Sequence, residues 1–173
     1  MCFTPGGDCA GLIARAVGEA RREVLVQAYA FTSAPVAEAL ARAAARGVRV
    51  RVVLDDSQLG ERYTVAAYLD RRGVEVWVDD PPGIAHNKVM VLDRAAVLTG
   101  SFNFSRAAQE RNTENLVLLR DPALAAAYAE NWERRRAESA PLDEARRALA
   151  ARASSGEGDA AETPKRPPRV GLF

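Results

Sequence analysis

Apolar residues follow two spacings along this chain, and each spacing predicts a different kind of element. In residues 8–22 they recur every three or four positions with Arg and Glu between them, which predicts a helix. In residues 24–31 they form a nearly continuous run, which is typical of a strand buried on both faces. The same criteria predict helices over residues 35–46, 61–72 and 122–136, and strands over residues 48–54, 74–78, 88–92, 95–99 and 115–119.

Residues that favour boundaries separate these elements. Thr32 and Ser33 are suitable N-cap types before the second helix, and Gly47 follows its end. Residues 93–94 predict the turn of a hairpin between two short strands. Residues 55–60 and 79–83 are expected to be loops, because they are polar or rich in Pro and Gly.

The order of the elements predicts the fold class. Helices and strands alternate early, and a hairpin and another strand follow, which predicts an α/β fold with a mixed β-sheet and helices packed on both of its faces. We assign residues 3–140 to one domain. In the polar remainder, residues 141–173, we expect a weak helix over 143–153 and a disordered tail over 154–173, which is rich in Gly, Pro, Ser and charge.

The charge balance restricts the partners of the chain as a whole. The 173 residues include 24 basic and 23 acidic side chains, for a net charge of +1. This excludes a polycationic nucleic-acid coat but not a local basic groove. No apolar run reaches the roughly 18 residues of a membrane helix, and no N-terminal signal-peptide pattern is present. The expected location is the cytoplasm by default, or the periplasm or exterior if a signal peptide has been removed.

The two cysteines, Cys2 and Cys9, are too few for a tetrahedral zinc site or a disulfide framework. They could close one small loop in an exported protein. We expect two free thiols instead, as in a reducing compartment.

Lysine and histidine are rare in this chain. Of the 24 basic residues 22 are Arg, so that Lys88 and Lys165 are the only lysines, and His86 is the single histidine. Lys88 therefore stands two residues from the only imidazole. Because Arg and Lys differ in shape and hydration, a Lys kept in this background indicates a site that needs a compact charge.

His86 and Lys88 are the first candidates for chemistry. On an extended segment, residues two apart point to the same face, so that the imidazole and the ammonium converge at the start of the strand over residues 88–92. Such a pair suits a phosphate group. The Lys neutralises charge, and the His can attack or transfer a proton near neutral pH.

Later segments add neutral and acidic groups to this candidate site. Ser101 and Asn103 alternate onto one face and offer hydroxyl and amide donors to phosphate oxygens. Gly100 allows the backbone to approach an anion closely. The predicted hairpin places these residues beside His86, where Glu114 could accept a proton from an imidazole N–H and fix its tautomer.

The combined pattern resembles the HKD signature of the phospholipase D superfamily. The motif H-x-K-x4-D followed by G-S-x-N-F-S consists here of His86, Lys88, Asp93, Gly100, Ser101, Asn103 and Ser105. Residues 5–8, 28–32, 46–48 and 52–55 extend the resemblance, which spans about residues 3–136. The chain is most similar to the small bacterial endonucleases with one motif and to the mitochondrial cardiolipin hydrolase type. The resemblance makes residues 3–140 a phospholipase D-like phosphodiesterase domain with its motif region at 80–107.

The resemblance also implies a reaction. In this superfamily a histidine attacks phosphorus and forms a phosphohistidine that water hydrolyses, a second histidine protonates the leaving oxygen, and no metal or cofactor is needed. His86 is then the nucleophile, Lys88 and Asn103 hold the phosphate with help from Ser101, and Glu114 orients an imidazole.

The chain has one histidine, although this reaction uses two imidazoles. Larger members of the superfamily carry two motifs, whereas this sequence has no internal repeat. We therefore expect a homodimer in which His86 of each chain reaches one shared site. Asp93, the third letter of the motif, is expected to be structural, tying the hairpin to its surroundings without touching substrate.

Three functions remain open at this stage. The first is a nuclease on DNA or RNA, which the small size and the positions of Arg106 and Arg111 beside the motif favour. The second is a phospholipase D acting on phosphatidyl lipids or cardiolipin, although no basic amphipathic helix is present to seat the protein on a bilayer. The third is a non-catalytic binder of phosphate backbones, against which the complete motif argues.

Two other charged groups have simpler explanations. The acidic pairs at residues 55–56 and 79–80 are expected to cap loops at strand ends rather than bind a metal, since no His or Cys accompanies them. The arginines at residues 134–136 are expected to form a solvated helix end, where their charge is favourable to the helix dipole.

Overall fold

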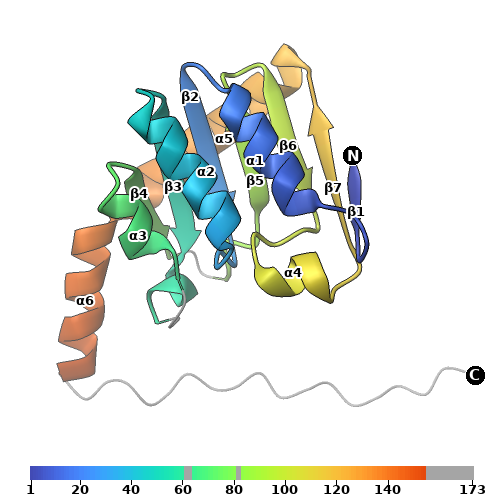
Figure 1. Ribbon diagram of the computed structural model, residues 1–173. Helices are drawn as coiled ribbons and strands as arrows, with labels where there is room; N and C mark the ends of the chain where they lie inside the picture. The colour runs from blue at the N-terminus through green and yellow to red at the C-terminus, as the bar shows by residue number, and fades with distance from the viewer. Residues whose placement is uncertain (61–63, 81–82, 155–173) are drawn as a thin grey trace, which may run out of the picture.

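The computed structural model describes residues 1–60, 64–80 and 83–154, and within them eight strands form one sheet (Figure 1). The strands are β1 (Cys2–Thr4), β2 (Glu23–Ala28), β3 (Arg49–Asp55), β4 (Glu75–Asp79), β5 (Lys88–Leu92), β6 (Ala96–Gly100), β7 (Glu114–Leu119) and β8 (Ala140–Pro141). Their order is β1-β7-β6-β5-β2-β3-β4-β8. β3 is parallel to β2 and β4, while all other neighbours are antiparallel. The predicted mixed sheet is therefore confirmed.

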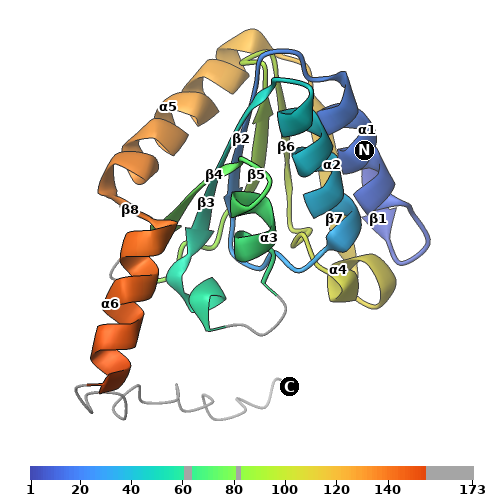
Figure 2. The ribbon, with the colours of Figure 1, turned by 60° about the vertical axis from the view of Figure 1, so that its left-hand side comes forward.

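Helices lie on both faces of this sheet, as predicted. They are α1 (Cys9–Glu19), α2 (Ala34–Ala45), α3 (Ala66–Asp70), α4 (Arg106–Glu110), α5 (Pro122–Glu138) and α6 (Leu142–Ser154). Figures 1 and 2 show α1 and α2 side by side on one face and α5 running diagonally across the other. Helix α6 follows β8 and lies against β4 and β8, at that edge of the sheet.

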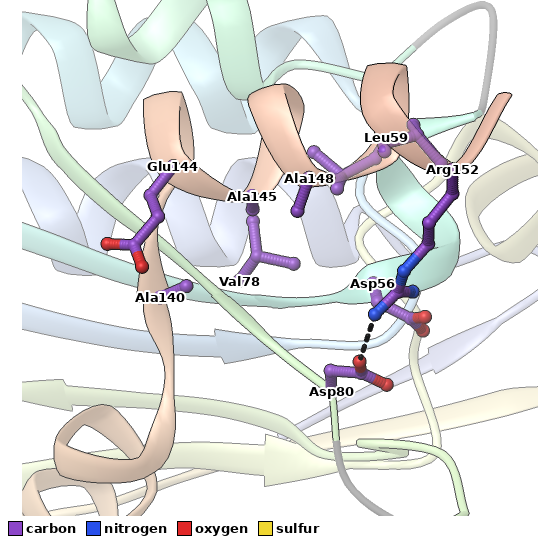
Figure 3. Close-up of a pocket in the computed structure, with 10 residues that line it drawn as sticks. Asp56, Leu59, Val78, Asp80, Ala140, Glu144, Ala145, Ala148 and Arg152 are labelled. Carbon is purple, nitrogen blue, oxygen red and sulfur yellow. Dashed lines mark ion pairs between the residues drawn. The ribbon is translucent and has the colours of Figure 1, made fainter. Parts of the chain in front are cut away.

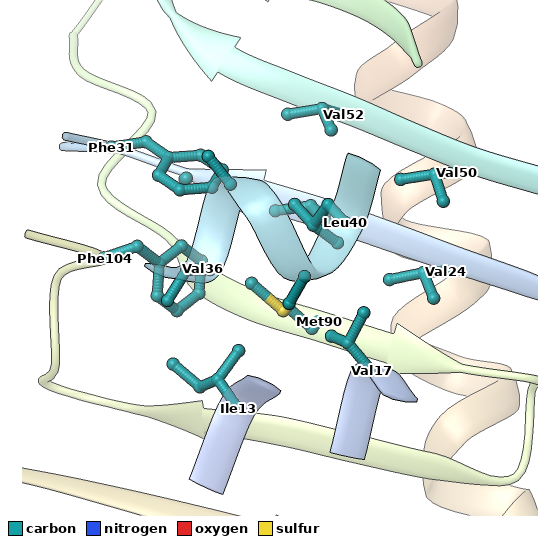
Figure 4. Packing of buried hydrophobic residues seen from close by; sticks show 14 of the residues in the cluster. Ile13, Val17, Val24, Phe31, Val36, Leu40, Val50, Val52, Met90 and Phe104 are labelled. Carbon is teal, nitrogen blue, oxygen red and sulfur yellow. The ribbon is translucent and has the colours of Figure 1, made fainter. Parts of the chain in front are cut away.

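Two apolar cores result, because successive strand residues point to opposite faces. Under α1 and α2, helix residues such as Ile13, Val17 and Leu40 pack on strand residues such as Val24, Val52 and Met90 (Figure 4). Phe31 and Phe104 close the same core at the end where β2 finishes. The second core lies under α5 and includes Leu25, Val53, Val91, Val97 and Trp132.

The short elements differ most from the sequence prediction. The helix predicted over residues 61–72 is only α3, Ala66–Asp70, although residues 61–63 lie outside the described part of the chain. The loop expected over 55–60 contains a 3₁₀ helix, η1 (Asp56–Leu59). Strands β1 and β8 and helix α4 were not predicted, because β1 and β8 have only three and two residues and the five residues of α4 cover little more than one helical turn. Apart from Ser154, which ends α6, the tail expected to be disordered lies outside the described residues.

The prediction of free thiols at Cys2 and Cys9 is wrong, because the two residues form a disulfide with their Cα atoms 5.5 Å apart. Pairing of β1 with β7 places Cys2 beside the first turn of α1. The Gly7 N–H donates to the Phe3 carbonyl at 3.0 Å and closes the connecting turn. Strand β1 brings the cysteines together, and its three residues gave no sequence signal.

The expectation of a solvated helix end at residues 134–136 is also wrong for Arg135. Its guanidinium donates to both carboxylate oxygens of Asp79 at 2.9 and 2.5 Å, and Asp79 is only 1% exposed. A planar guanidinium matches a carboxylate in this two-point geometry. Asp79 thus attaches the end of α5 to the end of β4 rather than capping a loop.

Asp93 joins the β5–β6 hairpin to the start of β2. Its carboxylate accepts hydrogen bonds from the backbone N–H groups of Arg21, Arg22 and Glu23 at 2.9, 2.7 and 3.0 Å. Asp93 and Arg94 have φ values of 52° and 53°, which are typical of a type I′ hairpin turn. Partial burial works to raise the pKa of Asp93, but these three donors outweigh it, and the pKa lies below its usual value.

We expect Asp93→Ala to lower the free energy of unfolding by about 2 kcal/mol at pH 7, because three backbone donors lose a charged acceptor. A carboxylate whose pKa is lowered by folding stabilises the protein above its unfolded pKa of about 3.9, and this contribution is lost as the pH falls through the folded pKa. In urea titrations at several pH values, the difference in the free energy of unfolding between Asp93→Ala and wild type should therefore become smaller as the pH falls.

Asp93→Asn is the matched control for this prediction, since Asn also tolerates positive φ and keeps an acceptor. It should be intermediate in stability. An Asp93→Ala protein as stable as wild type at pH 7 would contradict the anchoring role.

Candidate active site

Six residues that are dispersed in the sequence line one open depression of about 420 Å³. The depression lies where β5 begins and β6 ends, at the lower end of the sheet in Figure 1. Its lining residues are His86, Lys88, Gly100, Ser101, Asn103 and Glu114. The structure thus brings together every candidate except Asp93, which lies at the far end of β5.

His86 and Lys88 are in direct contact. The Lys88 Nζ lies 2.9 Å from His86 Nδ1 and donates to the His86 carbonyl at 2.7 Å. An ammonium has only donors, so Nδ1 accepts, and a neutral ring in this arrangement carries its proton on Nε2. His86 is exposed, whereas Lys88 is 7% exposed.

Burial lowers the pKa of Lys88, and the negative charge of Glu114 partly opposes this effect. Charged groups close to Lys88 therefore matter more than they would in water. A phosphate brought into the depression would favour the protonated ammonium, because an opposite charge nearby stabilises the charged form.

Ser101 and Gly100 are fixed by the neighbouring strand β7. The Ser101 Oγ accepts hydrogen bonds from the backbone N–H and the side-chain amide of Asn115, at 3.1 and 3.3 Å. Gly100 has a φ of 155°, and a Cβ there would collide with the Asn115 carbonyl oxygen. Close approach of β7 therefore accounts for this glycine.

Asn103 enters the depression between two core anchors. Phe102 and Phe104 are 0% and 1% exposed, as the alternation of this segment predicts. The Asn103 Oδ1 is buried and has no hydrogen-bond partner within the described part of the chain. Ser105, the last letter of the motif, caps α4 by accepting from the Ala108 N–H at 3.2 Å.

Glu114 lines the depression, but it makes a different contact from the one expected. Its carboxylate accepts from the Asn112 side-chain amide at 3.0 Å. No hydrogen bond joins Glu114 to His86 among the described residues, and Nδ1 faces Lys88 instead. Residue spacing could place Glu114 near the imidazole but could not distinguish these two contacts.

Two residues that are not part of the motif, Asp55 and Tyr29, hold the backbone on the two sides of His86. The carboxylate of Asp55, which is 0% exposed, accepts from the Ala85 N–H at 2.6 Å and also caps η1, as expected of a loop-capping residue. The Tyr29 N–H donates to the Asn87 carbonyl at 2.9 Å. The Tyr29 ring lies beside the His86 imidazole, with the ring centroids 4.6 Å apart.

Arg106 is exposed near the motif and pairs with Glu110 on the same helix turn. Its Nε lies 2.7 and 2.9 Å from the two carboxylate oxygens. Arg111 lies just beyond the end of α4 and is also exposed. Both are available to a long anionic substrate, although Arg106 must share its charge with Glu110.

A second cavity, of about 190 Å³, lies between α6 and the ends of β4 and η1 (Figure 3). Leu59, Val78 and Ala148 form apolar walls, and Arg152 pairs with Asp80 at its edge. Among residues 1–60, 64–80 and 83–154, neither His nor Lys lines this cavity. It therefore lacks the nucleophile and the compact charge that the first depression combines.

No group of three or more His, Cys, Asp or Glu side chains within residues 1–60, 64–80 and 83–154 is arranged to hold a metal ion. Within these ranges, no helix combines the length and the apolar character needed to cross a membrane.

Comparisons with known proteins give the family. Residues 13–136 match the family described as cardiolipin synthase, PLD-like domain. A phospholipase D of Rickettsia conorii is 43% identical over 138 residues, which cover 80% of this chain and 69% of the relative. The mitochondrial cardiolipin hydrolase of Homo sapiens is 31% identical over 134 residues, covering 77% of this chain and 53% of the human protein.

A solved structure agrees with these relatives. Nuc from Salmonella typhimurium, a phospholipase D family member, has a TM-score of 0.78 and 33% identity, covering 82% of this chain and 95% of Nuc. The chain belongs to the phospholipase D superfamily, as its motif indicated. It is thus an enzyme of the phosphodiester-hydrolysing class, not the catalytically inactive binder that the sequence alone left open.

Proposed function

We propose that this protein hydrolyses phosphodiester bonds of nucleic acid through a phosphohistidine on His86, without a metal ion. The observation that carries the proposal is the convergence of His86, Lys88 and Asn103 in one open depression. These include the only histidine of the chain and one of its two lysines.

The proposed reaction has two displacement steps. His86 Nε2 attacks phosphorus while Lys88 and Asn103 bind the non-bridging oxygens, and a general acid gives its proton to the departing oxygen. Water then attacks the phosphohistidine and loses a proton to a general base, which releases His86. Ser101 helps to hold the phosphate, while Glu114 bonds to Asn112 and places its negative charge near Lys88.

The contact between His86 and Lys88 in the structure is the starting point for these two reaction steps. While the ammonium occupies Nδ1, the neutral ring keeps its proton on Nε2, the atom that must attack. A bound phosphate attracts Lys88 to its own oxygens. Nδ1 can then carry the ring proton, and the Nε2 lone pair becomes available to phosphorus.

We further propose that two copies of the chain share one site. The reaction requires a nucleophile and a separate acid, and the sequence contains one histidine. A two-fold axis at the depression would bring His86 of each protomer to one phosphate. Ile84, two residues from His86, is 60% exposed and offers an apolar contact at this location.

The depression favours nucleic acid over lipid. None of its six lining residues has an apolar side chain that could hold an acyl chain, whereas two exposed cations, Arg106 and Arg111, follow the motif in the sequence. A phospholipase D activity on phosphatidyl lipids or cardiolipin is the second candidate, and the names of the Rickettsia and human relatives favour it.

A parallel assay tests substrate and metal dependence together. We expect cleavage of single-stranded DNA or RNA to exceed cleavage of cardiolipin and phosphatidylcholine vesicles, and to continue in excess EDTA. The physical reason is that Lys88, Asn103 and His86 supply the charge and the nucleophile that a metal would otherwise provide. Activity that disappears with EDTA and returns with Mg²⁺ would contradict the mechanism. Hydrolysis of cardiolipin alone would select the second candidate.

A further inference from the structure

Tyr29 is the aromatic residue closest to the reacting groups. Its ring centroid lies 4.6 Å from that of His86, with an angle of 51° between the planes, and the Lys88 Nζ lies 5.3 Å from the same ring. One side chain therefore contacts both the imidazole and the ammonium. Within the described residues, no other aromatic ring contacts His86 or Lys88.

The sheet register brings this ring to the site. Ala28, at the end of β2, is the antiparallel partner of Lys88 in β5. The Tyr29 N–H extends this pairing by donating to the Asn87 carbonyl at 2.9 Å. The backbone that directly follows His86 is thus tied to β2 and to Tyr29, the residue after this strand.

Tyr29 does not belong to either apolar core. It is half-buried and is absent from the clusters that pack under α1 and α2 or under α5. Its neighbours Ala28 and Phe31 are buried in the first core. The ring is therefore placed against the functional groups rather than used to fill the interior.

We propose that Tyr29 is a positioning residue that holds the His86 imidazole and the Lys88 ammonium in their reactive arrangement. This inference rests on the function proposed above. His86 is exposed, and among the described residues its ring nitrogens have one hydrogen-bond partner, Lys88. Once a phosphate draws Lys88 away, the ring contact with Tyr29 is what remains to keep the imidazole from turning away from phosphorus.

Two physical effects support this role. An aromatic ring packed against an imidazole restricts the rotation of the imidazole side chain. This restriction matters because small errors in the direction of attack on phosphorus strongly slow the reaction. A cation near an aromatic ring is also stabilised by the ring quadrupole. The second effect favours the charged Lys88 in a location where burial lowers its pKa.

Two substitutions separate the ring from the hydroxyl. Tyr29→Phe keeps the ring, so kcat on bis(4-nitrophenyl) phosphate should stay within about twofold of wild type. Tyr29→Leu removes the ring, and kcat should fall about tenfold or more with little change in KM, because alignment is lost while the phosphate clamp remains.

Tyr68→Leu is the matched control. The Tyr68 ring also lies beside a cation, with the Arg72 guanidinium 4.9 Å from its centroid, but it packs against the first core and does not line the depression. The kcat of Tyr68→Leu per folded molecule should equal that of wild type. Equal losses of kcat in the Tyr29→Leu and Tyr68→Leu proteins would show a general effect on the fold and would overturn the proposal.

The single histidine provides a readout independent of turnover. Its imidazole protons give one set of NMR signals, whose shifts and pH titration should be kept in Tyr29→Phe and altered in Tyr29→Leu. In the wild-type protein, nuclear Overhauser contacts should connect these protons to the Tyr29 ring, so the test survives even if Tyr29→Leu does not fold. Absence of those contacts, or unchanged His86 signals and kcat in Tyr29→Leu, would overturn the proposal.

These measurements also distinguish the inference from the proposed function. If His86→Ala keeps full turnover, the proposed function fails whatever Tyr29 does. If His86→Ala is inactive and Tyr29→Leu is fully active, the function stands and the positioning role of Tyr29 is rejected.

Discussion

Replacing His86 with Ala is expected to reduce turnover by at least about 10⁴-fold while leaving the fold intact. The substitution removes the attacking nitrogen and, in a shared site, the acid supplied to the partner chain. His86 is exposed and outside both apolar cores, so its loss creates no cavity. Steady-state kinetics and circular dichroism on the same preparation check both parts of the prediction.

Mixing this variant with wild type tests the shared site. If a complete site needs His86 from both chains, heterodimers are inactive, and an equal mixture after full exchange should show about half the turnover per wild-type chain. The fall follows from random pairing, which halves the share of wild-type chains in wild-type dimers. Constant turnover per wild-type chain would mean that each chain carries its own acid, with Glu114 as the first alternative.

Lys88→Arg is expected to remove most of the turnover without unfolding the protein. Lys88 is 7% exposed, and its compact ammonium contacts His86 Nδ1 and faces the Tyr29 ring. A planar guanidinium is larger and cannot reproduce this geometry. We expect kcat to fall about 10²-fold or more on a short phosphodiester.

Lys165→Arg is the matched control, since it makes the same change at the only other lysine of the chain. It should have wild-type kinetics. Near-normal turnover in Lys88→Arg would show that a compact ammonium is unnecessary and that the choice of Lys over Arg at this position is incidental.

The long elements were predictable because their periodicity reflects burial. The strand predicted over residues 88–92 is β5 without any change of boundary, and the hairpin turn at Asp93 and Arg94 has the positive φ values that such a turn requires. The helix predicted at 61–72 fails because an apolar pattern does not show where the first helical turn forms. The Cys2–Cys9 disulfide was missed because it depends on a three-residue strand.

The site was predictable to the extent that its residues share one motif. Spacing and the expected hairpin were enough to place His86, Lys88, Ser101 and Asn103 together, and Glu114 joins them. The actual contacts required three dimensions. Glu114 bonds to Asn112 instead of the imidazole, and Tyr29 reaches His86 only through the register of β2 and β5.

The central claim is that His86 becomes covalently bonded to phosphorus. Rapid acid-free quenching of the wild-type enzyme during its first turnover on internally ³²P-labelled single-stranded DNA tests this directly. We expect labelled protein whose phosphorus bond is stable in alkali and labile in acid, as a phosphoramidate is, and no label on His86→Ala. Because the chain has one histidine, a phosphohistidine can lie only on His86, and the His86→Ala control distinguishes it from a phosphoramidate on lysine. An alkali-labile ester, or product formation in the first turnover without labelled protein, would contradict the account.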